Sequence, residues 1–132
     1  MFFRNEYWFL SNMYPCKIRV NGLEFECAEA CFQSFKTTDP ELRAKFQHLN
    51  GFEAKKFGKK VKLRPDWNNI RLDVMKEVIR VKFKQHPDLL KKLTEIKGDI
   101  VENNTWHDTF WGVCNGKGYN HLGKILMEIR DK

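Results

Sequence analysis

The sequence has no long hydrophobic run, no internal repeat and no low-complexity segment, and these absences exclude several classes of protein. The longest stretch without a charged residue, Tyr7 to Cys16, has ten residues, about half of what a membrane-spanning helix needs. Glu6 interrupts the pattern of a signal peptide almost at once, so we expect none. The sequence therefore predicts a soluble, cytoplasmic protein with no membrane partner.

Motifs for metals and cofactors are also missing. The four cysteines form no Cys-x-x-Cys pair and no Cys/His set at zinc spacing; they are Cys16, Cys27, Cys31 and Cys114. A P-loop, a dinucleotide fingerprint and a serine-nucleophile elbow are absent. We therefore expect no metal, no cofactor, and reduced, mostly buried thiols.

The composition is that of a folded domain with a basic surface. Hydrophobic residues make up 42% of the 132 residues and charged residues 31%, which predicts one domain, residues 1–132, with a core of its own. The net charge of +7 favours polyanionic partners such as nucleic acid, nucleotide phosphates or an anionic surface, without choosing among them.

The first third of the chain predicts a β-hairpin. Lys17–Val20 and Leu23–Glu26 alternate apolar with polar residues, and Asn21-Gly22 joins them. Asn-Gly between two such runs is the strongest short hairpin signal, because both turn positions need a positive φ.

Helices are predicted over most of the remaining chain. The apolar spacing indicates helices at about 28–37, 40–49, 66–85, 88–97 and 122–129, with a short segment around 52–57 leading into a basic loop. Asn50-Gly51 is expected to end the second helix, and residues 103–118 are expected to form a loop. The fold class is therefore α+β: a predominantly helical single domain packed on a small antiparallel sheet.

The first group of residues with chemical potential lies on the helix after the hairpin. Glu29, Gln33 and Lys36 fall on one narrow stripe, and two turns, roughly 10 Å, separate the carboxylate from the lysine. Such a pair can perform acid–base or Schiff-base chemistry if burial lowers the lysine pKa. The simpler alternative is the polar stripe of an amphipathic helix.

A second group is basic. Six of the ten residues from 55 to 64 are Lys or Arg, and Gly58 interrupts them. A glycine there can break a helix and expose backbone N–H groups to a phosphate, although a solvated basic face explains the same pattern. Arg64 and Trp67 follow; the indole either stacks on a base or belongs to the core.

The third group is the segment 103–120, which combines Asn, Asp, His, two Trp and three Gly. A loop of this length in a compact domain is usually functional or disordered, and its aromatic content argues against disorder. The four histidines are scattered and are expected at the surface; they are His48, His86, His107 and His121.

Motifs along the first half of the chain resemble those of one protein family. Phe9-Leu-Ser-Asn-Met-Tyr-Pro15 resembles its opening Phe-Ser-Asn-Phe segment. Glu29, Phe32-Gln33 and Lys36 resemble its Glu-His-Tyr-Phe-Gln-x-x-Lys helix. Leu63-Arg-Pro-Asp-Trp67 resembles its Leu-Arg-x-x-Trp segment.

The second half continues the series in the same order. Ile100-Val-Glu102 resembles Leu-Val-Glu, and Asp108-Thr-Phe-Trp-Gly112 resembles Asp-x-x-Trp-Gly. Gly118-Tyr-Asn-His-Leu-Gly123 and Leu126-Met-Glu-Ile-Arg130 resemble Gly-x-Asn-x-Leu-Gly and Leu-Met-x-x-Arg. Each motif alone is weak, but their shared order covers nearly the whole chain. On these residues the sequence resembles the NADAR family of YbiA-like N-glycosidases.

The resemblance implies a YbiA-like fold and cleavage of an N-glycosidic bond to ribose. The implied activity is removal of ADP-ribose from guanine bases of nucleic acid, or hydrolysis of a ribosylaminopyrimidine phosphate of riboflavin synthesis. The implied catalytic residues are Glu29, Trp67 and Asp108, with Lys36 as a further candidate. The implied substrate-binding residues are Asn12, Arg64, Trp111, Gly112 and Asn120.

The expected partner is thus a ribosylated base or a nucleotide-type small molecule, or an ADP-ribosylated nucleic acid. Two alternatives stay open: a non-catalytic module that binds ADP-ribose or nucleic acid, and a structural domain whose aromatic residues are all core. The sequence leaves the oligomeric state, the substrate and the chemical route undecided.

Overall fold

The computed structural model describes residues 1–132 as two compact units. One unit is formed by Asn12–Gln85 and the other by Met1–Ser11 together with His86–Lys132. The prediction of a single domain stays a prediction. No helix is both long and apolar enough to cross a membrane.

The unit Asn12–Gln85 begins with the predicted hairpin, which the structure confirms. Strands β1 (Pro15–Val20) and β2 (Leu23–Cys27) pair antiparallel. Asn21 and Gly22 take φ values of 52° and 80°, as a two-residue turn with both central residues left-handed requires.

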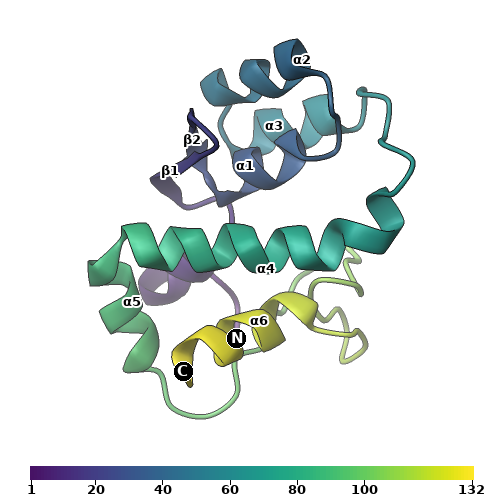
Figure 1. The fold of residues 1–132 in the computed structure, drawn as a ribbon. Helices are drawn as coiled ribbons and strands as arrows, with labels where there is room; N and C mark the ends of the chain where they lie inside the picture. Colours follow the sequence, from purple (N-terminus) through teal and green to yellow (C-terminus); the bar gives the residue numbers. More distant parts are fainter. The chain divides into compact units, whose positions relative to one another are not determined.

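Four α-helices follow the hairpin in this unit (Figure 1). They are α1 (Ala28–Ser34), α2 (Pro40–Lys45), α3 (Gly51–Gly58) and α4 (Trp67–Gln85), with the short 3-10 helix η2 (Phe46–His48) between α2 and α3. Helix α1 packs against β2, α3 and α4. The predicted fold class, a mostly helical chain with a small antiparallel sheet, is confirmed.

The boundary between α2 and α3 differs from the prediction. Asp39 caps α2 as expected, because its Oδ1 accepts a hydrogen bond from the Glu41 N–H at 2.9 Å. Asn50, expected to end a helix, instead begins α3 by forming a capping box with Glu53. Asparagine is favoured both just before the first residue of a helix and in turns. The residue type therefore did not distinguish the start of α3 from the end of the preceding helix.

Helix α4 has the predicted bounds to within one residue, but its apolar stripe is not buried throughout. Ile70, Val74 and Val81, which lie on that stripe by their helical spacing, are only half-buried. Lys82 is fully buried instead. Helix α4 packs against both α1 and β1, so its buried arc is wider than the apolar stripe alone indicated.

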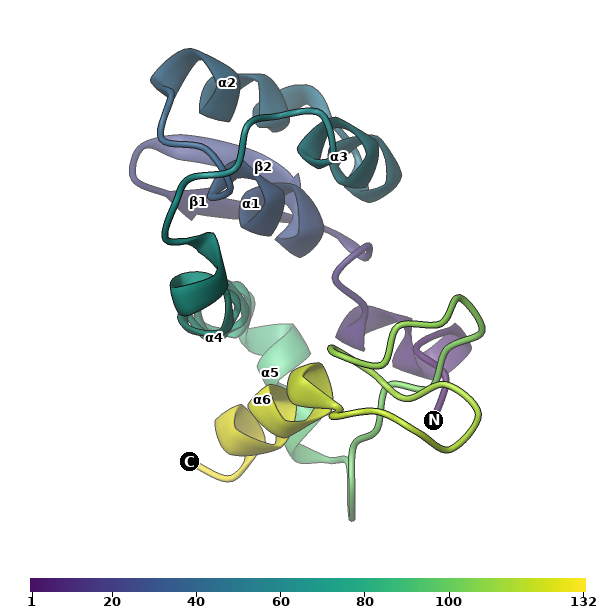
Figure 2. The ribbon, with the colours of Figure 1, turned by 90° about the vertical axis from the view of Figure 1, so that its right-hand side faces the viewer.

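The second unit comprises the 3-10 helix η1 (Asn5–Leu10), α5 (Pro87–Thr94) and α6 (His121–Arg130). Helices α5 and α6 pack together through a core that includes Leu89, Leu93, Leu122 and Leu126. Figure 2 shows the loop before α6 beside the start of the chain. The N-terminal ammonium donates to the Val101 carbonyl at 3.0 Å. The predicted loop at 103–118 is confirmed and contains only isolated bridges.

Candidate functional site

Helix α1 owes its start to a backbone contact rather than a side-chain cap. Cys27 precedes the helix and makes no capping hydrogen bond, and the N–H of Glu29 donates to the Asn12 carbonyl at 2.9 Å. The Asn12 side chain is buried, and its Nδ2 lies 3.4 Å from the Met75 Sδ. Its Oδ1 has no hydrogen-bond partner. Asn12 therefore positions the first turn of α1, where Glu29 lies.

The predicted polar stripe on α1 is present. Gln33 donates from Nε2 to Oε2 of Glu29 at 2.8 Å, one helical turn away. Glu29 is half-buried, whereas Gln33 is only 5% exposed. The neighbouring Ala30 and Cys31 are fully buried on the core side. The carboxylate of Glu29 is thus held by a hydrogen bond at the edge of the core.

Lys36 follows α1 and is half-buried. Burial lowers the pKa of its ammonium, the negative charge of Glu29 raises it, and the positive charges of Lys59 and Lys55 lower it further. A lysine with a lowered pKa holds more neutral amine at a given pH. The structure therefore places a carboxylate and a lysine of lowered pKa in one electrostatic environment.

Arg64 ties the basic segment to the end of α1. Its backbone N–H donates to the Lys36 carbonyl at 2.8 Å, and its Nη1 donates to the Phe35 carbonyl at 3.4 Å. The Nε and Nη2 atoms bind both carboxylate oxygens of Asp66, at 2.7 and 3.3 Å, which lowers the Asp66 pKa. These contacts hold the Arg64 guanidinium at the Phe35 carbonyl, where α1 ends.

Trp67 begins α4 and is 6% exposed. Its ring lies 5.2 Å from that of Phe32 at an angle of 54°. The indole is therefore fixed in place by α1, whichever of the two predicted roles it has.

Gly58 does not lie in an exposed loop, which argues against the phosphate-binding alternative for the basic segment and leaves the solvated basic face. It is the last residue of α3 and is buried. A Cβ at Gly58 would overlap Oε1 of Gln33 and would lie 2.8 Å from its Cδ. The glycine is required by close packing between α3 and α1, not by a phosphate-binding turn.

In the other unit, Asp108 is held by its own loop. Its Oδ1 accepts hydrogen bonds from the N–H groups of Phe110 and Trp111, at 3.0 and 2.9 Å. Asn104 fixes the backbone of Asp108 by two further hydrogen bonds. One carboxylate oxygen, Oδ1, therefore accepts both hydrogen bonds of the turn, and the other oxygen, Oδ2, accepts neither.

The other predicted residues of this unit also support the loop. Asn120, with φ at 54°, accepts from the Glu102 N–H at 2.9 Å and donates to the Ile100 carbonyl at 3.0 Å. Gly112 is buried where a Cβ would overlap the Glu102 carbonyl. Trp111 is half-buried and meets Phe110 edge-on, with 4.7 Å between ring centroids. Asn120 and Gly112 thus hold the loop in shape.

The structure groups the predicted residues into two sets, one in each unit. Asn12, Glu29, Lys36, Arg64 and Trp67 gather around α1 in the unit Asn12–Gln85. The second set, in the other unit, surrounds the loop before α6 and consists of Asp108, Trp111, Gly112 and Asn120.

Sequence reasoning placed Gln33 on the stripe of Glu29 without assigning it a role in the site, and it missed Asn104. Gln33 shares the stripe of Glu29, and its spacing of four residues was the signal for a hydrogen bond. Asn104 carried no signal, because a buried loop asparagine has no distinguishing pattern.

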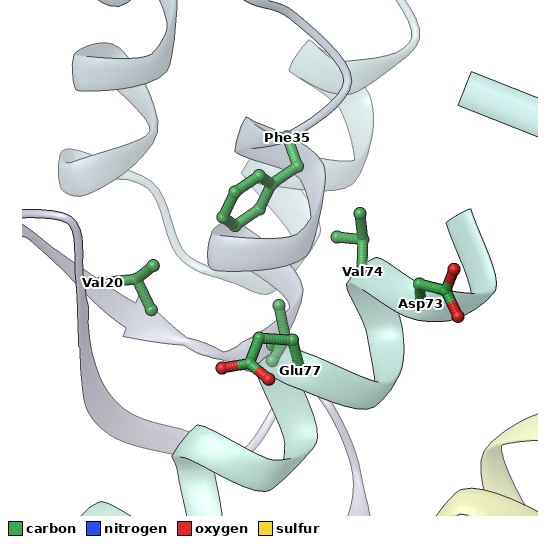
Figure 3. Close-up of a pocket in the computed structure, with 6 residues that line it drawn as sticks. Val20, Phe35, Asp73, Val74 and Glu77 are labelled. Atoms are coloured by element: carbon green, nitrogen blue, oxygen red, sulfur yellow. The ribbon is translucent and has the colours of Figure 1, made fainter. Parts of the chain in front are cut away.

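A pocket of about 210 Å³ lies elsewhere in the first unit (Figure 3). Phe35, which lines it, is two residues after Gln33, so its side chain lies about 160° around the helix from that of Gln33. None of the predicted site residues lines this pocket; its lining consists of Val20, Phe35, Asp73, Val74, Glu77 and Val78.

A model of the NADAR domain matches residues 1–132. The chain belongs to the NADAR domain family. This NADAR chain is 31% identical over 132 residues to N-glycosidase YbiA of Shigella boydii, covering 97% of this chain and 82% of that protein. The solution structure of Escherichia coli YbiA has a TM-score of 0.85 and 32% identity, over 96% of this chain and 78% of that one.

A second relative has a different name and a longer chain. A riboflavin biosynthesis protein of Vibrio vulnificus is 33% identical over 128 residues. The match covers 94% of the NADAR chain but only 35% of that protein. The family and the YbiA-like fold of this chain are therefore established, and the relatives' names span an N-glycosidase and a riboflavin biosynthesis protein.

Proposed function

We propose that this protein is an N-glycosidase that hydrolyses an N-glycosidic bond to ribose. The observation that carries the proposal is the electrostatic pairing of a hydrogen-bonded carboxylate on α1, Glu29, with a half-buried lysine of lowered pKa just after that helix, Lys36. Both residue types are suited to this bond, and the family contains named N-glycosidases.

Glu29 acts as the acid–base group in this proposal. Cleavage of an N-glycosidic bond passes through an oxocarbenium-like state or a ring-opened imine. A carboxylate stabilises the first, or removes a proton from a ribose hydroxyl or from water. The hydrogen bond from Gln33 holds the carboxylate in place for either task.

In the imine route, Lys36 acts as the nucleophile. Its neutral amine attacks C1′ of the ring-opened base imine and forms an N–C1′ bond. The C1′–N bond to the base then breaks, and the base leaves as an amine with a proton transferred from the attacking nitrogen. Water finally hydrolyses the lysine imine, which frees the sugar aldehyde and the amine. Burial, which lowers the Lys36 pKa, supports this role.

The remaining residues serve substrate binding. Trp67, braced by Phe32, forms a wall for the base. Asp108, with Oδ1 held by its loop, orients ribose hydroxyls or water through Oδ2. Asn12 and Trp111 stay proposed as substrate-binding residues, and Gly112 and Asn120 contribute by shaping the loop.

The basic residues beside Lys36 favour a phosphorylated substrate. Lys55 and Lys59 are exposed on and just after α3 and act on the Lys36 charge, and Arg64 is anchored to the Phe35 carbonyl at the end of α1. These cations suit the phosphate of a ribosylaminopyrimidine phosphate or the diphosphate of ADP-ribose.

The testing experiment incubates the protein with two substrates and follows products by mass spectrometry. The substrates are an oligonucleotide with ADP-ribosylated guanine and a ribosylaminopyrimidine phosphate. We expect release of ADP-ribose or ribose phosphate that disappears in Glu29→Gln and persists in the control Glu26→Gln, an exposed glutamate on β2. Release by Glu29→Gln at the wild-type rate would refute the assignment. Binding of ADP-ribose without release from either substrate would instead support the non-catalytic module.

Charge reversal separates a polymeric substrate from a small one. Changing Lys55, Lys56 and Lys59 to Glu removes the positive face of α3. If the natural substrate is a nucleic acid, this variant loses affinity for the oligonucleotide but retains turnover of the small substrate. Equal loss on both substrates would assign these lysines to the phosphate of the reacting nucleotide.

A further inference from the structure

The amide of Gln33 is unusual among the polar groups around α1. Its Nε2 donates to Glu29 at 2.8 Å, but its Oε1 is buried and accepts no hydrogen bond. A buried acceptor without a donor costs free energy. The orientation that the amide adopts is therefore the one that serves the carboxylate.

Gly58 provides the space for this arrangement. The Gln33 Oε1 lies where a side chain at Gly58 would be, since an added Cβ would overlap that oxygen and lie 2.8 Å from Cδ. The same Cβ would be 3.5 Å from the Gln33 Cβ, which is an ordinary contact distance. A side chain at Gly58 would therefore collide with the amide group of Gln33 alone and would still allow the two helices to approach as they do.

We propose that Gln33 and Gly58 are positioning residues for the proposed N-glycosidase, which hold the Glu29 carboxylate oriented for reaction. The inference rests on the proposed function of Glu29. Gln33 acts by donating to Oε2, and Gly58 acts through Gln33 by leaving room for its amide. Neither residue touches the substrate in this role.

The first test is a double-mutant cycle on turnover. Gln33→Ala removes the donor, and Gly58→Ala displaces it. We expect each to lower kcat roughly 10- to 100-fold with little change in KM, as misplacement of a catalytic group does. In the Gln33→Ala background the added methyl at position 58 has no amide to displace, so Gly58→Ala should cause no further loss.

Two outcomes of this cycle overturn the proposal. An equal loss from Gly58→Ala in both backgrounds would mean that the glycine does not act through Gln33. Wild-type kcat in Gln33→Ala would mean that the hydrogen bond does not position the carboxylate. Ile79→Val, which removes one buried methylene from α4 in the same unit, is the control for general destabilisation and should retain kcat.

A second readout needs no substrate. The carboxyl carbon of Glu29 is titrated by NMR in the wild type and in Gln33→Met, which keeps the unbranched shape but lacks the donor. Lys36 and Cys27, the titratable groups that interact electrostatically with this carboxylate, are unchanged, so loss of the donor should move the midpoint upward, because the hydrogen bond stabilises the charged form. The acid limb of the pH–kcat profile should move in the same direction. An unchanged midpoint refutes the inference.

The same experiments separate this inference from the proposed function. Full turnover by Glu29→Gln would end the assignment of Glu29, while the NMR titration still tests its contact with Gln33. An inactive Glu29→Gln together with a fully active Gln33→Met would leave the proposed function intact and remove only the positioning role.

Discussion

The side chain of Asn104 forms two hydrogen bonds with the backbone of Asp108. Its Nδ2 donates to the Asp108 carbonyl at 2.8 Å, and its Oδ1 accepts from the Asp108 N–H at 3.0 Å. Asn104 is 4% exposed, so both bonds are shielded from water. The Asn104 amide thus fixes the conformation of the loop that carries the Asp108 carboxylate.

Asn104→Ala should therefore destabilise the fold. The change leaves the part-buried N–H and carbonyl of Asp108 without these partners, which costs about 1–3 kcal/mol of unfolding free energy. Urea denaturation measures the loss. The neighbouring Asn103→Ala is the matched control, because the recorded hydrogen bond of Asn103 is made by its backbone. Equal stability of the two variants would contradict a stabilising role of the Asn104 side chain.

Lys36→Arg should abolish turnover if the imine route operates. Arginine retains the positive charge but has no amine that can form an imine at accessible pH. Reduction with cyanoborohydride during turnover should attach the sugar to the peptide that contains Lys36. Because burial lowers the Lys36 pKa, the rate should reach its plateau at a lower pH than an ordinary lysine would allow.

The exposed Lys45 provides the control for this experiment. Lys45→Arg should turn over substrate and form the reduced adduct as the wild type does. Full activity of Lys36→Arg, with no adduct in any variant, would leave direct hydrolysis assisted by Glu29.

The elements that were correctly predicted are those whose sequence signal lies within a few neighbouring residues. The hairpin follows from Asn21-Gly22, whose positive φ values are observed, and the α2 cap follows from Asp39. The stripe of Glu29 and Gln33 follows from helix geometry. The two sets of site residues, by contrast, came from resemblance to a family, since their members are far apart along the chain.

What could not be predicted depends on tertiary contacts. Gly58 has the residue type of a helix breaker or a loop, and only the packing of α3 on α1 shows why a side chain is excluded. Lys82 is another case, because a lysine is almost never fully buried and the apolar stripe of α4 did not include it. Asn104 is a third, since its bonds join backbone groups that no pattern marks.

The start of α3 offers a test of the corrected helix boundary. The Asn50 Oδ1 accepts from the Glu53 N–H at 2.9 Å, and the Glu53 Oε1 accepts from the Asn50 N–H at 2.9 Å. Asn50→Ala should lower stability by about 1 kcal/mol, the usual cost of a lost cap. Asn68→Ala, at an exposed position within α4, should be neutral or slightly stabilising by helix propensity. Equal thermal midpoints for both would argue against the capping box.

Lys82 should make stability depend on alkaline pH. Its side chain is fully buried, and burial lowers its pKa from 10.5 to about 8. Between these values the folded protein has released the proton while the unfolded chain still binds it, so stability rises with pH across this window. Cys31 acts in the opposite sense above about pH 9, because burial raises its pKa to about 12.

A comparison of the wild type with Lys82→Met isolates the contribution of Lys82 to the pH dependence, since both proteins contain Cys31. From pH 8 to pH 10, the unfolding free energy of the wild type should rise relative to Lys82→Met, by up to about 3 kcal/mol. Urea denaturation at intervals of half a pH unit gives both curves. A parallel pair of curves would show that the buried lysine titrates alike in the folded and unfolded chain, and so that its burial does not lower its pKa.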